Sequence, residues 1–173
     1  MNSFYTFADT AGMESGERRS GLPGLTGLFR ESVADLPDGS RIAFTGSVGG
    51  CLPIAELLAL AVRKRGFQLS FVPLADPAEA RPMRWAEGVG FTVGAEKMML
   101  QQADALVVLG GLAMPKIGRP VEEVESLHRQ LGSPRLIGVG FMGVLERMGW
   151  TKRLPFDALI DGHIDAAMWS KER

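Results

Sequence analysis

The chain has 173 residues, a net charge of −1 and 46% hydrophobic residues. This length suits one domain with a single sizeable core, and a charge near zero provides no basic field for a nucleic-acid backbone. Glycine is frequent, with 22 residues where an average composition would give roughly 12. We therefore expect a folded domain with no nucleic-acid partner, in which glycines have local roles.

The number of cysteines and the lengths of the apolar runs indicate the cellular compartment of the protein. Cys51 is the single cysteine, so the chain has no internal disulfide and no pair of cysteines for a zinc or redox motif. The first twenty residues include Asp9, Glu14 and Glu17 and lack the apolar run of a secretory signal. No stretch of 18 apolar residues occurs in the sequence. We expect a cytoplasmic protein without a membrane segment.

The N-terminal segment differs in composition from the rest of the chain. Residues 1–21 are polar, rich in glycine and serine, and show no periodicity, so we expect a poorly ordered arm. The regular pattern begins at Leu22. We therefore expect a single α/β domain over residues 22–173.

The first part of that domain predicts a β-strand, an α-helix and a second, parallel strand, preceded by one more helix. Helical spacing of apolar residues and short apolar runs distinguish the two kinds of element. A glycine-rich loop at 47–51 separates the first strand from the next helix. In chain order we predict a helix over 22–36, a strand over 41–46, a helix over 54–62 and a strand over 67–73.

The second part repeats this alternation. Asp76, Pro77 and Glu79 form a capping pattern that predicts the start of a helix. Glycines then interrupt the pattern at 88–94. We next predict a helix over 95–102, a strand over 104–109, a helix over 121–131, a strand over 135–139, a helix over 142–148 and a strand over 156–160.

Five strands that alternate with helices predict a three-layer, doubly wound α/β sandwich. We expect a five-stranded, mostly parallel sheet. The right-handed crossover rule favours the flavodoxin-like strand order 2-1-3-4-5 over the Rossmann-like order 3-2-1-4-5.

In such a sheet, ligands bind beyond the carboxyl ends of the strands, where the connections diverge. The two loops expected there are rich in glycine, and the helix after the first one would offer its N-terminus to an anion. Apolar side chains after the fourth strand could cover a ring system. The candidate ligand-binding residues are Thr45, Gly46, Ser47, Gly49, Gly50, Cys51, Gly110, Gly111, Met114, Lys116, Phe141 and Met142.

Several alternatives remain open at this point. The glycine loops could be simple turns in a homodimeric interaction or structural module without a ligand. Cys51, near a helix N-terminus, could be a catalytic nucleophile. The glycine loop at 46–50 departs from the GxGxxG spacing and the sequence contains no P-loop motif, so the cofactor, if any, stays unknown. Asp161, His163 and Asp165 form a weak metal pattern at the expected sheet edge, and we predict no metal site.

Three segments together resemble a family of small proteins of methanogenic archaea that is known only as a domain of unknown function. They are Thr-Gly-Ser-Val-Gly-Gly-Cys-Leu-Pro at 45–53, Leu-Gly-Gly-Leu-Ala-Met-Pro-Lys at 109–116 and Ile-Gly-Val-Gly-Phe-Met at 137–142, followed by Gly149-Trp150. The resemblance covers about residues 22–164 and implies a cytoplasmic archaeal protein with a Rossmann-like α/β fold. It implies no activity, so no catalytic residue is taken from it.

Overall fold

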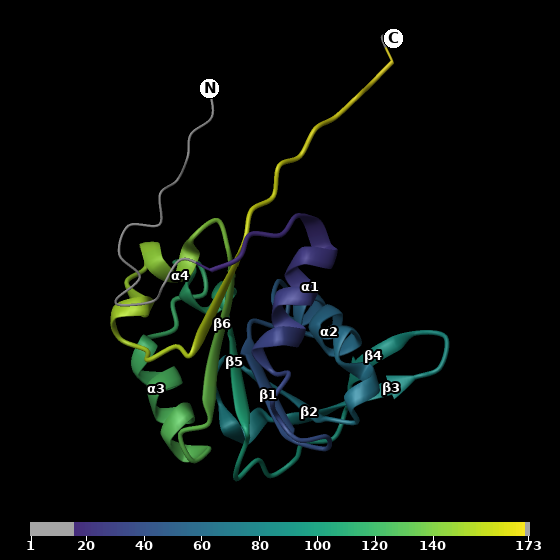
Figure 1. Cartoon of the computed structure of the whole chain (residues 1–173). Coiled ribbons are helices and arrows are strands. Elements are labelled where there is room, and N and C mark those ends of the chain that lie inside the picture. Colours follow the sequence, from purple (N-terminus) through teal and green to yellow (C-terminus); the bar gives the residue numbers. More distant parts are fainter. Residues whose placement is uncertain (1–15, 172–173) are drawn as a thin grey trace.

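A seven-stranded mixed sheet forms the centre of the molecule in a computed structural model that describes residues 16–171. The strands lie in the order β4-β3-β2-β1-β5-β6-β7 (Figure 1). Their bounds are β1 Arg41–Gly46, β2 Gln68–Pro73, β3 Arg81–Ala86, β4 Gly90–Val93, β5 Ala105–Leu109, β6 Arg135–Phe141 and β7 Ala158–Gly162.

Helices cover both faces of this sheet. Figure 1 shows α1 and α2 on one side and α3 and α4 on the other. The helix bounds are α1 Gly21–Ser32, α2 Leu52–Ala61, α3 Val121–Gln130 and α4 Val144–Arg147. Short 3-10 helices cover Arg63–Arg65, Pro77–Glu79, Gly110–Ala113 and Trp150–Lys152. The alternating side chains of the central strands point into two separate apolar cores, one on each face.

The strands β2, β1, β5, β6 and β7 are neighbours in that order and run parallel to one another. β5 is buried along its whole length, as expected for a central strand covered on both faces. Because parallel strands end at the same side of the sheet, the loops after β1, β5 and β6 are neighbours. We call these three loops the carboxyl edge.

The expected five-stranded sheet is wrong, because a hairpin adds β3 and β4 to the edge of β2. Both added strands are antiparallel to their neighbours, so the sheet is mixed. The glycines at 88 and 90 have positive φ angles of 74° and 110° and form the turn of this hairpin. The turn residues predicted an interruption, whereas they connect two strands.

The helix expected to start at Asp76 is also absent from the described chain. The Asp76 carboxylate does accept a hydrogen bond from the Ala78 N–H at 3.0 Å, but only a 3-10 turn follows. Pro82 disfavours a longer helix, since proline inside a helix removes a hydrogen bond and clashes with the preceding turn, and the pairing of β3 with β2 takes the segment into the sheet.

The segment expected as a helix over 95–102 is irregular and links β4 to β5. Its Met98 N–H donates to the Ala80 carbonyl oxygen at 2.8 Å, which ties the segment to the start of β3. The helices predicted around α1, α2, α3 and α4 are confirmed, with ends that differ by a few residues.

The expected N-terminal arm lies largely outside the described residues, because the description begins at Gly16. The last residues before α1 pack against that helix. A Cβ atom at Gly24 would lie 2.7 Å from Arg19 Cβ, and the Arg19 guanidinium pairs with Glu31 at 2.7 Å.

Candidate functional site at the carboxyl edge

The loop after β1 leads directly into α2. The Cys51 N–H donates to the Ser47 carbonyl oxygen at 3.1 Å, which closes a turn over Val48, Gly49 and Gly50. These three residues are exposed. Their N–H groups donate to no acceptor within residues 16–171. The turn therefore presents free backbone donors to solvent.

The N-terminus of α2 adds further positive potential. Its N-cap residue, Cys51, makes no side-chain capping bond, and the first turn contains no acidic residue. The partial positive charge of the helix end is thus not compensated by a local carboxylate. An oxyanion is the group that such a helix end binds well.

Cys51 itself points inward and is 4% exposed. A Cβ atom at Gly111 would lie 2.3 Å from the Cys51 Sγ, and one at Gly46 would lie 2.3 Å from the Cys51 Cβ. Both glycines therefore make room for the cysteine side chain. They also show that the loops after β1 and β5 are in direct contact.

The polar neighbour of the Cys51 thiol is the Ser47 hydroxyl, with 3.4 Å between Oγ and Sγ. A hydroxyl group is not a base that could activate a thiol. In the described part of the chain, the geometry therefore provides no general base for thiol catalysis at Cys51.

Thr45 is fully buried and holds β1 to the turn that follows β2. Its hydroxyl donates to the Val72 carbonyl oxygen at 2.8 Å and accepts from the Ala75 N–H at 3.1 Å. Leu74 and Ala75 have φ angles of 53° and 59°, in the left-handed region that non-glycine residues rarely adopt. The Thr45 hydroxyl helps to hold this strained turn and does not face the solvent.

The loop after β5 has a packed start and an exposed end. A Cβ atom at Gly110 would lie 2.5 Å from Val144 Cγ1 and 3.0 Å from Gly140 Cα, so this glycine allows β5, β6 and α4 to approach closely. Met114 and Lys116, further along, are exposed. The loop thus brings the cation Lys116 and the apolar side chain of Met114 to the carboxyl edge.

The turn after β6 is organised by Asp161, a residue that sequence reasoning considered only as a metal ligand. The Gly143 N–H donates to both oxygens of the Asp161 carboxylate at 2.9 Å. Phe141 is half-buried beside it, and Met142 is 45% exposed with a φ of 55°. The Asp161 carboxylate holds this strained turn in place. The sequence signal for this role was a charged residue directly after the strand predicted over 156–160.

The Asp161 side chain is only 7% exposed, and its Oδ2 lies 3.1 Å from His163 Nε2. Burial raises the pKa of Asp161 above its usual value, although the Gly143 N–H and the nearby His163 and Arg147 act in the opposite direction. No group of three or more possible metal ligands occurs among the described residues.

With this geometry established, comparisons with known proteins show the family. Residues 20–165 match the family described as an uncharacterized protein conserved in archaea, DUF2124. The chain belongs to this family. The resemblance seen in the sequence is therefore confirmed.

Relatives of this DUF2124 chain come from methanogens. An uncharacterized protein of Methanocaldococcus jannaschii is 34% identical over 156 residues, which cover 90% of this chain and 94% of that protein. An uncharacterized protein of Methanothermobacter thermautotrophicus is 36% identical over 155 residues, with 88% and 96% covered.

A solved structure is similar over the same region. The crystal structure of a protein of unknown function from Methanothermobacter thermautotrophicus superposes with a TM-score of 0.84 at 35% identity. The match covers 93% of this chain and all of that chain. Within residues 16–171, no helix is long and apolar enough to cross a membrane.

Proposed function

We propose that this protein binds a small anionic or nucleotide-like ligand at the carboxyl edge. The observation that supports this most directly is the turn at Val48, Gly49 and Gly50. It presents three backbone N–H groups that have no acceptor among residues 16–171, immediately before a helix N-terminus with no side-chain cap and no acidic residue in its first turn. Backbone donors that converge on a helix N-terminus favour phosphate or carboxylate oxygens.

The neighbouring loops supply groups that complement such a ligand. Lys116 gives a cation that could pair with a second oxyanion. Met114 and Met142 are 46% and 45% exposed and provide polarizable apolar surface for a ring system. Cys51, Gly46 and Gly111 form the packed base of the site in this proposal and do not contact the ligand.

A thermal-shift panel tests the proposal. Inorganic phosphate, adenine nucleotides, flavin nucleotides, nicotinamide cofactors and methanogen coenzymes would each be added in excess. A ligand at 100 times its dissociation constant stabilises the fold by about 2.7 kcal/mol, or roughly 5–10 °C in Tm for a chain of this size. We expect such a shift with at least one phosphate-bearing compound.

A pair of variants locates the site. Gly49→Asp places a carboxylate in front of the free N–H groups, whereas Gly49→Asn has the same size without the charge. A Cβ atom at Gly49 would have nothing within 4 Å, so both variants retain the fold. We expect Gly49→Asp to lose at least tenfold in affinity for the compound found in the panel and Gly49→Asn to keep it. The proposal is overturned if Gly49→Asp and Gly49→Asn bind the compound with equal affinity.

A second candidate function is self-association as a homodimer. It is favoured by the tail after β7, where Ile164, Met168 and Trp169 are 62%, 88% and 89% exposed. Apolar side chains with this exposure are unusual in a monomer unless they bind a partner. We also propose a cytoplasmic location, because Cys51 is a buried free thiol of the kind found in reducing compartments.

A further inference from the structure

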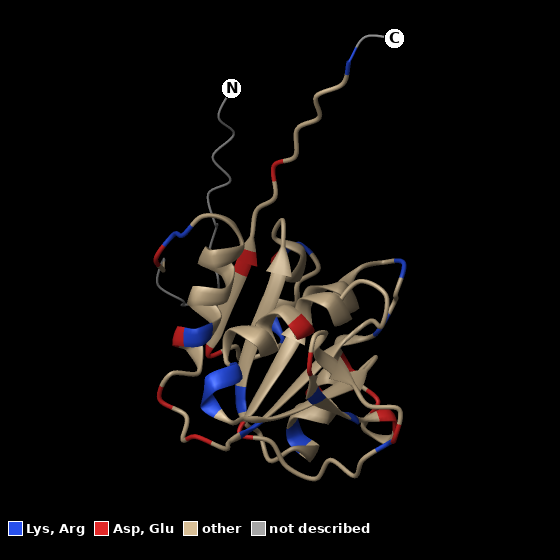
Figure 2. Cartoon of the chain, turned by 90° about the vertical axis from the view of Figure 1, so that its right-hand side faces the viewer, with Lys and Arg blue, Asp and Glu red and all other residues tan. Residues whose placement is uncertain are grey.

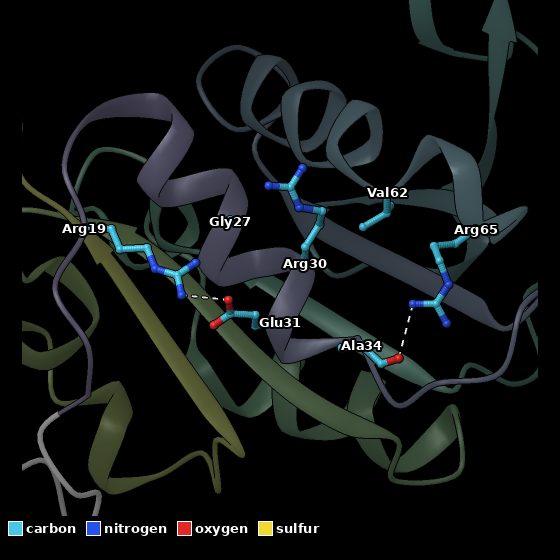
Figure 3. Close-up of a pocket in the computed structure, with 7 residues that line it drawn as sticks. All are labelled: Arg19, Gly27, Arg30, Glu31, Ala34, Val62 and Arg65. Carbon is cyan, nitrogen blue, oxygen red and sulfur yellow. Dashed lines mark hydrogen bonds and ion pairs between the residues drawn. The ribbon is translucent and has the colours of Figure 1, made fainter.

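A second site lies at the other end of α2, away from the carboxyl edge. It is a pocket of about 270 Å³ between α1 and the residues that follow α2. Three of its lining residues are the arginines Arg19, Arg30 and Arg65, against one acidic residue, Glu31. We call it the basic pocket (Figure 3). Figure 2 shows that basic and acidic segments are interspersed over the chain as a whole.

Two of the guanidinium groups converge over Gly27 in the middle of α1. The position of a Cβ atom at Gly27 would be 3.0 Å from Arg19 Nη1 and 3.8 Å from Arg30 Nη2. Figure 3 shows Arg30 extending from α1 into the space between the helices, while Arg19 reaches in from the segment before α1. Both guanidinium groups thus lie within 4 Å of one point beside α1, where an anion would interact favourably with each of them.

The arginines differ in how well they are neutralised. Arg19 pairs with Glu17 at 2.8 Å and with Glu31 at 2.7 Å. Arg65 donates to the Asp38 carboxylate at 2.5 Å and to the Ala34 carbonyl oxygen at 3.2 Å. Both guanidinium groups are thereby fixed in place.

Arg30 is the exception. It forms no ion pair, hydrogen bond or ring contact with any residue of the described chain. Its charge therefore stands beside the paired Arg19 with no acidic partner of its own. Among residues 16–171, the pocket thus holds one positive charge that no acidic side chain compensates.

We propose that the basic pocket binds a small oxyanion, a phosphate or carboxylate group, between Arg19 and Arg30. Arginine suits this role because its planar fork can donate two parallel hydrogen bonds to such a group. Arg65 adds to the positive potential without leaving its own partners. This site is separate from the carboxyl edge, so either site can exist without the other.

Isothermal titration with inorganic phosphate, and in a second arm with citrate, tests the proposal. The titrated protein would carry Gly49→Asp, so that binding at the carboxyl edge does not add to the signal. We expect Arg30→Gln to weaken binding at least tenfold. The matched control is Arg129→Gln, which removes another exposed helical arginine without an ion pair in the described structure and should leave affinity unchanged.

The arms identify the class of anion. If only phosphate binds, the natural ligand carries a phosphoryl group, and if only citrate binds, it carries a carboxylate. If both bind, the pocket recognises negative charge rather than one kind of oxyanion. Each result supports the pocket if Arg30→Gln weakens that binding at least tenfold. The proposal is overturned if neither anion binds at millimolar concentration, or if Arg30→Gln and Arg129→Gln bind equally. Circular dichroism of both variants verifies that the fold is retained.

Discussion

Cys51 has little free space because two glycines, one at the end of β1 and one just after β5, surround its side chain. Gly46 is near in the sequence, but Gly111 is sixty residues away and meets the thiol only through the pairing of β1 with β5. The abundance of glycine after strand ends was visible in the sequence. The contact that explains these two glycines was not, because it depends on which strands are neighbours.

Gly111→Ala should therefore destabilise the protein. The new methyl group would lie 2.3 Å from the Cys51 Sγ, and such overpacking costs about 1–3 kcal/mol. Urea unfolding measures this change in the free energy of unfolding. Gly50→Ala is the matched control at the carboxyl edge, because its nearest contact would be an ordinary 3.8 Å to the Ser47 Oγ.

Combining Gly111→Ala with Cys51→Ala removes the clashing sulfur. We expect the double variant to be less destabilised than the sum of the single variants, since the two side chains are in contact. Strictly additive effects would contradict the packing that we describe.

At the scale of elements, an ion pair joins the end of α1 to the start of β6. The Asp35 carboxylate binds the Arg135 guanidinium through two contacts of 2.5 and 2.7 Å, and Arg135 also donates to the Ser32 carbonyl oxygen at 3.0 Å. The hydrogen bonds from Arg135 lower the pKa of Asp35 from 3.8 to about 2. The pair is exposed on the Asp35 side, so solvent and salt weaken it.

The lowered pKa of Asp35 determines how the stability contributed by this ion pair depends on pH. A carboxyl group that is more acidic in the folded than in the unfolded state adds stability above its unfolded pKa, and this stability is lost as the pH falls through the folded pKa. We expect Asp35→Asn to unfold at lower urea concentration than wild type at pH 7. The difference should shrink between pH 4 and pH 2.

Asp165→Asn is the control for this experiment, since Asp165 has no ion pair within the described residues. A difference between Asp35→Asn and wild type that stays constant down to pH 2 would contradict the assigned role of the pair.

The elements also show where sequence reasoning succeeds. Strands with nearly continuous apolar content, such as β5, and helices with a clear apolar face, such as α3, could be predicted. The β3–β4 hairpin could not, because the capping pattern at Asp76 is a local signal for a helix and the alternation in β3 is weak. The pairing of β3 with β2 makes this segment a strand, and that contact is not local in the sequence.

At the scale of the whole molecule, the fold is shared with the solved structure from Methanothermobacter thermautotrophicus, while the tail after β7 extends from the body of the fold (Figure 1). Self-association through this tail gives a testable expectation. Truncation after His163 should convert a dimer into a monomer, as measured by light scattering coupled to size-exclusion chromatography.

A full-length variant with Met168→Ser and Trp169→Ser distinguishes the effect of the apolar side chains on dimerisation from the effect of the tail's length. It should be monomeric, like the truncated chain. A monomeric full-length protein at micromolar concentration, or a truncated protein that remains dimeric, would exclude this role of the tail.

The segments that flank the fold have a practical consequence. Figure 1 shows that the segment entering α1 and the start of the tail leaving β7 both lie on the side of the sheet where β1, β5 and β6 end. A partner joined directly before α1 or directly after β7 would therefore stand beside the loops that we propose to bind an anion, and it could shield the site. Fusions inserted at the β3–β4 turn, at the opposite end of the sheet order from β7, would leave both segments and the carboxyl edge open.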